Sequence, residues 1–204
     1  MLTKISCITL GMSLAFLLNM PDNWSVRIFG STFTEIDKRK NDSVAIYYNR
    51  GISDSSPEGR TIWIQKAIKK AKSIKNDSLR QNRLNYLSLQ LTDFNDKSIF
   101  LEANRAAVKS SISLKDSTAL ANAYWDRGDF HMHQFVQDSS YLFYSKAQEV
   151  FEAQGEAVLS ARMRIQMANR QQVVKDYLGA EANLVAALAQ LKPLNETGHL
   201  LRAY

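Results

Sequence analysis

Apolar residues recur every three or four positions from about residue 44 onward, and nowhere do they alternate for long with a period of two. This spacing is typical of amphipathic helices, because it places apolar side chains on one face of the helix. Breaks separate the periodic segments at residues 53–59, 76–78, 93–96, 115–117, 137–139, 155, 175–177 and 195–198. Short helices joined by short turns pack as antiparallel neighbours. The pattern therefore predicts an all-α chain of antiparallel helix pairs.

Alanine recurs at similar places in successive segments, at Ala67, Ala106, Ala147 and Ala187. The spacing is about 40 residues, which is the period of an α-solenoid whose repeat is a helix pair. A methyl group fits where two helices cross at close range, and a larger side chain would push the helices apart. The spacing therefore predicts that Ala147 and Ala187 are buried at helix crossings.

One stretch in the second half of the chain carries a characteristic series of residues. The series is Tyr124, Arg127, Gly128, His131, Ser140, Tyr144, Ala147 and Gly155. In its spacing it resembles the aromatic, Leu-Gly, Tyr, Ala, aromatic and Ala positions of the tetratricopeptide repeat (TPR) family. The following unit departs from the family at Arg164 and Gln171, where aromatic residues are preferred.

The resemblance covers residues 60–204 and implies a TPR-like α-solenoid, with helix pairs stacked into a right-handed superhelix. It also implies that the last repeat is truncated and that residues 21–59 form an irregular helical cap. Short phrases at 120–124, 138–141, 175–181 and 200–204 resemble a narrower group of TPR proteins. These are the exported TPR sensor regions that precede bacterial histidine kinases or helix-turn-helix regulators. This likeness implies a sensing region of a larger bacterial signal-transduction protein. The alternative is a stand-alone exported adaptor or scaffold with no effector domain.

The first 20 residues have the outline of a secretory signal peptide, with Lys4 followed by an apolar run over residues 5–18. As a helix this run would be about 21 Å long, shorter than the roughly 30 Å hydrocarbon core of a bilayer. A cleaved signal is therefore favoured, although an uncleaved anchor stays open because no pair of small residues follows Leu18. We expect an exported chain that is periplasmic or faces the periplasm, bound to a membrane only through this anchor or a further span beyond Tyr204.

The 26 lysines and arginines exceed the 20 aspartates and glutamates, so the formal net charge is +6. The densest basic stretch is one helix face, with Lys66, Lys69, Lys70, Lys72 and Lys75. The opposite face is apolar, with Ile62, Ile64, Ala67, Ile68, Ala71 and Ile74. We interpret the lysines as a solvated face and the charge excess as mostly spread along the chain. Nucleic-acid binding would need aromatic or arginine platforms among these lysines, so no nucleic-acid partner is expected.

The common hydrolase, nucleotide-binding and metalloprotease motifs do not occur in the sequence. His131 and His133 would point about 200° apart on a helix, which prevents them from sharing a metal ion. We expect His131 to pack between helices and His133 to face solvent. Asp126 and Asp129 share a helix face, where a solvated pair is expected rather than an acid–base pair. With Cys7 as the one cysteine, the sequence predicts a non-enzymatic chain without cofactor or metal.

With catalytic, metal-binding and nucleic-acid-binding roles not expected, the remaining function is to bind a protein or peptide. In solenoids of this type the first helix of each pair lines the concave side, where its polar residues can meet a protein or peptide ligand. The predicted groove residues are Asn82, Asn85, Asn122, Asp126, Asp129, Arg162, Gln166, Asn169 and Arg170.

Overall fold

The computed structural model describes residues 42–194, which form eight α-helices and one short 3-10 turn. The elements are α5 (Ser43–Ser53), α6 (Pro57–Lys72), α7 (Asp77–Gln90), α8 (Lys97–Leu114), α9 (Ser117–His133), α10 (Gln137–Ala153), α11 (Ala157–Val173), α12 (Tyr177–Leu191) and η1 (Lys192–Leu194). The expected signal peptide, the first part of the expected cap and the expected truncated end lie outside the described residues. Within the described range there is no strand, which confirms the all-α prediction there.

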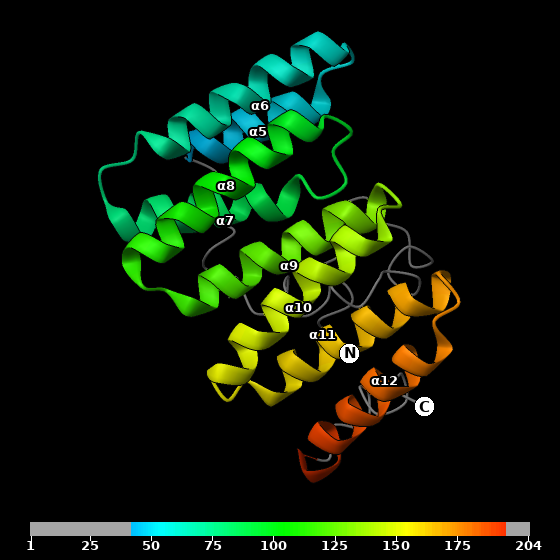
Figure 1. Cartoon of the computed structure of the whole chain (residues 1–204). Helices are drawn as coiled ribbons and strands as arrows, with labels where there is room; N and C mark the ends of the chain where they lie inside the picture. Colours follow the sequence, from blue (N-terminus) through cyan, green and yellow to red (C-terminus); the bar gives the residue numbers. More distant parts are fainter. Residues whose placement is uncertain (1–41, 195–204) are drawn as a thin grey trace, which may run out of the picture.

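Each helix packs against the next one along the chain, and α6 also contacts α8 while α7 contacts α9. Figure 1 shows the helices following one another in chain order, from α5 and α6 at one end to α11 and α12 at the other. No helix in the described part is both long and apolar enough to cross a membrane.

The last four turns of the array share one backbone geometry. Lys115, Phe135, Gly155 and Lys175 all have positive φ, between 54° and 75°. At every one of these turns the following amide donates to the carbonyl five residues earlier, at 2.9 Å. This is the Schellman arrangement, which ends a helix and satisfies its last carbonyls. Because the same turn recurs at positions 115, 135, 155 and 175, two helix–turn units account for the alanine spacing of about 40 residues.

The start of most helices is fixed by a polar side chain that accepts hydrogen bonds from first-turn amides. These N-caps are Asp42, Ser56, Asn76, Asp96, Asp116 and Asp176. Within the described residues the predicted breaks overlap the observed turns, with one clear exception, and the predicted break at 195–198 lies outside these residues. Residues 137–139 form the first turn of α10, and the break lies at residues 134–136. The local sequence does not reveal this break, because a phenylalanine, Phe135, occupies the left-handed position that usually favours glycine or asparagine.

The apolar core is divided into three clusters, as expected for an array in which each helix contacts only near neighbours. The first extends from α5 to α9, the second joins α9, α10 and α11, and the third joins α11 and α12. Ala67, Ala147 and Ala187 are fully buried in these clusters, which confirms the prediction of burial for Ala147 and Ala187. Ala106 is half-buried, and its neighbour Ala107 takes the buried position.

Gly128 allows α9 and α10 to approach closely. A Cβ atom at Gly128 would lie 2.5 Å from Cδ1 of Tyr144, closer than real carbon atoms come. The Ser140 hydroxyl of α10 also donates a hydrogen bond of 3.0 Å to the Gly128 carbonyl. The absence of a side chain at this position therefore sets the distance between the two helices.

Helix α6 has the lysine face and apolar face that the sequence predicts. Its lysines are exposed, while Ile64, Ala67, Ile68 and Ala71 are buried against the core. Ile62 differs from the expectation, because about half of its surface is exposed.

Candidate functional site

The nine predicted groove residues lie on alternate helices, α7, α9 and α11. Their environments differ sharply. Asn82 is exposed, whereas Asn85, Asn122, Gln166, Asn169 and Arg170 are half-buried. Asp126, Asp129 and Arg162 are buried. The structure therefore divides the set into residues that face solvent and residues that are embedded among the helices.

The expectation of a solvated Asp126–Asp129 pair is wrong. Asp126 is 2% exposed and Asp129 is 5% exposed. Both lie well inside α9. This helix packs against α7 and α8, which precede it in the chain, and against α10, which follows it. The Asp129 carboxylate accepts a hydrogen bond of 2.8 Å from the Tyr144 hydroxyl. Burial, followed by the charge of Asp129, raises the pKa of Tyr144 well above its ordinary value, so the phenol remains a donor.

Arg162 is the third buried member of the predicted set. Its guanidinium carbon lies 5.7 Å from the centre of the Trp125 ring, which is within the range of a cation–π contact. The helix periodicity could not reveal this contact, because it joins residues on α9 and α11. Gln81 also makes a contact between helices. Its side-chain amide donates hydrogen bonds to Asn85 on its own helix, α7, and to Ser111 on α8.

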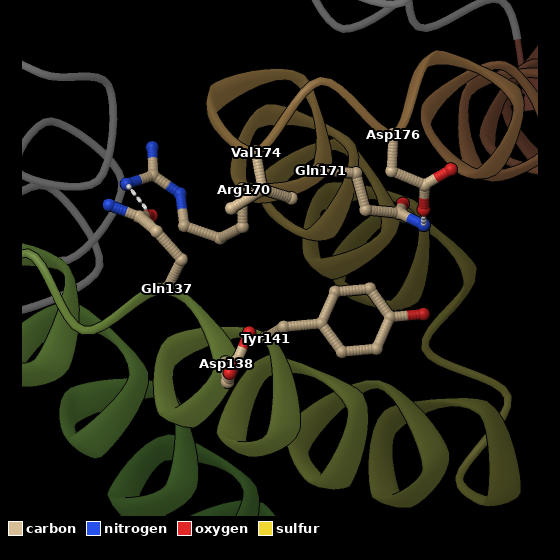
Figure 2. Close-up of a pocket in the computed structure, with 7 residues that line it drawn as sticks. All are labelled: Gln137, Asp138, Tyr141, Arg170, Gln171, Val174 and Asp176. Atoms are coloured by element: carbon tan, nitrogen blue, oxygen red, sulfur yellow. Dashed lines mark hydrogen bonds between the residues drawn. The ribbon is translucent and has the colours of Figure 1, made fainter.

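Arg170 lines a cleft of about 400 Å³ between the start of α10 and the turn that joins α11 to α12 (Figure 2). The lining residues are Gln137, Asp138, Tyr141, Arg170, Gln171, Val174 and Asp176. Arg170 donates a hydrogen bond of 3.3 Å from Nη1 to Oε1 of Gln137. Gln171 donates one of 2.8 Å from Nε2 to the Asp176 carboxylate. Figure 2 shows these two pairs on either side of the opening, with the Tyr141 ring on the α10 side.

Large apolar side chains are exposed in the two turns beside this cleft and at the helix ends next to the second turn. They are Phe135, Val136, Val173, Val174, Tyr177 and Leu178. Phe135 is 85% exposed and Leu178 is 82% exposed. Gln137 follows the first turn and Val174 belongs to the second, and both line the cleft, so each turn borders it. The sequence signal for this surface is the presence of bulky apolar residues at turns, where small or polar residues are usual.

A second cavity, of about 260 Å³, lies between α8 and α9. Its lining residues are Arg105, Val108, Lys109, Ile112, Tyr124 and Arg127. The Arg127 guanidinium carbon lies 4.3 Å from the centre of the Phe143 ring. Burial, followed by the neighbouring Arg105, lowers the pKa of Arg127. Positive charge is mostly spread along the sequence, but the packing of α8 on α9 brings Arg105, Lys109 and Arg127 to one cavity.

His131 and His133 are separated as the helix geometry predicts. His131 is buried and stacks on Phe143, with 5.5 Å between the ring centres and 9° between the planes. His133 is exposed. Burial, followed by the charges of Arg127 and Lys97, lowers the pKa of His131. Among the described residues no three His, Cys, Asp or Glu side chains are grouped so that they could hold a metal ion.

Comparison of the sequence with models of known protein families and with curated proteins finds no match.

Proposed function

We propose that this chain is a non-catalytic module that binds a protein or peptide ligand, built as a TPR-like α-solenoid. The repeated Schellman turn, the division of the core and the spacing of the buried alanines support a solenoid. The residue series from Tyr124 to Gly155 supports the TPR-like assignment. An array of this kind presents extended surfaces on which a partner can lie.

The observation that carries the binding proposal is the apolar surface beside the polar cleft at Arg170. Exposed apolar patches with a polar rim mark protein interaction sites, because burial of the patch favours association. Here the exposed side chains of Phe135, Tyr177 and Leu178 would supply apolar contact area. Arg170 and Asp138 would supply polar groups of both charges at the cleft. This arrangement suits a short peptide segment that has apolar anchors and both hydrogen-bond donors and acceptors.

We further propose that the module is the extracytoplasmic sensing region of a larger bacterial signal-transduction protein. The support for this role is the likeness of the short sequence phrases to exported TPR sensor regions. In that role, ligand binding at the cleft would change the packing of α10 on α11, the two helices that line it, beside the turn that leads to α12. The coding sequence beyond Tyr204 would distinguish a sensor from an adaptor, because a sensor requires a membrane span and an effector domain.

A random peptide library provides the test, since selection from it can start without an identified ligand. Peptides would be selected on the purified chain, and their affinities measured by fluorescence anisotropy. We expect the double substitution Phe135→Ser, Leu178→Ser to weaken binding by at least about tenfold, which corresponds to about 1.4 kcal/mol. Ile62→Ser is the matched control, because Ile62 is also exposed but lies on α6 at the other end of the array (Figure 1). Equal affinities for all three proteins would contradict the proposed site.

A further inference from the structure

The cationic cavity between α8 and α9 is separate from the cleft at Arg170. Arg105 and Lys109 lie one turn apart on α8, and Arg127 reaches the same cavity from α9. A larger cavity of about 620 Å³ adjoins it and shares Arg105 and Lys109. Lys72 and Arg80 also line this second cavity. Five cations from four helices therefore line these two adjoining cavities.

The charge of the smaller cavity is not balanced by described carboxylates that line it, whereas in the larger cavity Lys72 is paired with Glu102 and Arg80 with Asp77. No Asp or Glu lines the smaller cavity. Glu102 is the one carboxylate that lines the larger cavity, and its Oε1 accepts a hydrogen bond of 2.5 Å from Lys72. Like charges held close together repel one another, and the pKa of Arg127 is lowered by burial first and then by the neighbouring Arg105. An anion placed between them would relieve this repulsion.

Arg127 is oriented by its surroundings. Its guanidinium lies over Phe143, and Lys146 lies over the same ring with Nζ 5.3 Å from the ring centre. Its Nε atom is buried and has no hydrogen-bond partner in the structure. A buried donor without a partner is costly, and a ligand oxygen could satisfy it. Arginine also presents several donors in a rigid plane that matches an oxyanion.

We propose that Arg105, Lys109 and Arg127 form a binding site for a phosphate-type oxyanion. The cavity of about 260 Å³ has room for a single phosphate group. A dianion compensates more of the three positive charges than one carboxylate does, so phosphate is favoured over acetate. Base stacking is disfavoured because Arg127 and Lys146 cover the Phe143 ring and Lys146 also approaches Tyr124. The site is therefore assigned to a phosphate group, either free or on a small ester.

The test is a titration of the whole chain with sodium phosphate, followed by amide NMR at constant ionic strength set with chloride. We expect saturable shifts at residues of α8 and α9 around Arg105 and Arg127. Arg127→Gln and Arg105→Gln should each weaken phosphate binding by at least about tenfold, because a charge-assisted hydrogen bond is lost. Lys69→Gln removes the same charge from an exposed site on α6 and should change the affinity less than about twofold. Circular dichroism of each variant would confirm that the helices remain folded.

Two further titrations identify the source of the phosphate group. O-phosphoserine represents a phosphate ester, and acetate represents a simple carboxylate. Saturable binding of phosphate or O-phosphoserine that depends on both arginines would support the proposal, and the tighter of the two ligands would indicate the source. The proposal is overturned if neither binds, if acetate binds equally well, or if Lys69→Gln weakens binding as much as the arginine variants.

Discussion

The Tyr144 hydroxyl of α10 donates a hydrogen bond of 2.8 Å to the Asp129 carboxylate of α9, and both residues are buried. The contact lies next to Gly128, where the ring of Tyr144 occupies the space that a side chain would need. One tyrosine therefore fills the space beside Gly128 between two helices and also donates a hydrogen bond to a buried carboxylate. The stability of the α9–α10 pair should be sensitive to changes at each of these positions.

Tyr144→Phe should lower the free energy of unfolding by about 1–3 kcal/mol, because the buried Asp129 loses a hydrogen-bond donor. Urea unfolding followed by circular dichroism would measure the change. Tyr141→Phe is the control, since Tyr141 is only half-buried and lies at the cleft. A change at Tyr144 no larger than that at Tyr141 would show that the buried hydrogen bond contributes little.

The same tyrosine predicts a loss of stability at high pH. Its pKa is raised in the folded chain, chiefly by burial and then by Asp129, whereas the unfolded chain has an ordinary tyrosine pKa of about 10. The stabilising contribution is complete below about pH 10 and decreases as the pH rises toward the folded-state pKa. The free energy of unfolding should therefore fall above about pH 10, and this fall should be smaller in Tyr144→Phe. Equal slopes for the two proteins would contradict the prediction.

Gly128→Ala should destabilise the chain by about 1–3 kcal/mol, because its methyl group would overlap the Tyr144 ring. The direction of the change in stability is informative, because alanine is otherwise favoured over glycine inside a helix by about 1 kcal/mol. Ala182→Gly, at an exposed position of α12, measures this intrinsic preference in the same protein. A more stable Gly128→Ala variant would mean that α9 and α10 are farther apart than described.

Ala147→Leu should cost about 1–3 kcal/mol, because Ala147 is fully buried and the core around it has no room for three more carbon atoms. Ala189→Leu adds the same atoms at an exposed position of α12 and should leave the melting temperature nearly unchanged. Differential scanning calorimetry of both variants provides the comparison. An unchanged melting temperature for Ala147→Leu would refute the alanine register on which the repeat is based.

His131 predicts a loss of stability in mild acid. Its pKa is lowered by burial and then by the charges of Arg127 and Lys97, relative to about 6.5 in an unfolded chain. Between the two pKa values the unfolded chain binds more protons, so stability falls as the pH drops below about 6.5. His131→Phe keeps a ring against Phe143 and should reduce this dependence between pH 5 and 7. A variant with the same pH dependence as the parent chain would assign the effect to other groups.

The helices and most of their ends could be predicted because periodicity and N-cap residues are local signals. The burial of Asp126 and Asp129 could not be predicted in this way, since α9 has polar residues on a side that its neighbours cover. The cationic cavity is also non-local. Arg105 and Arg127 lie on different helices, and their proximity follows only from the packing of α8 on α9. Local patterns thus identify elements, whereas sites depend on how the elements pack.

Ligand binding at the Arg170 cleft can be tested directly by amide NMR with a peptide selected on the chain. We expect the peptide to shift the resonances of residues around Gln137, Tyr141, Arg170 and Val174, which line the cleft. Resonances of α5 and α6 should remain unchanged, because these helices are at the other end of the array (Figure 1). Saturable shifts confined to α5 and α6, with none at the cleft, would contradict the proposed binding site.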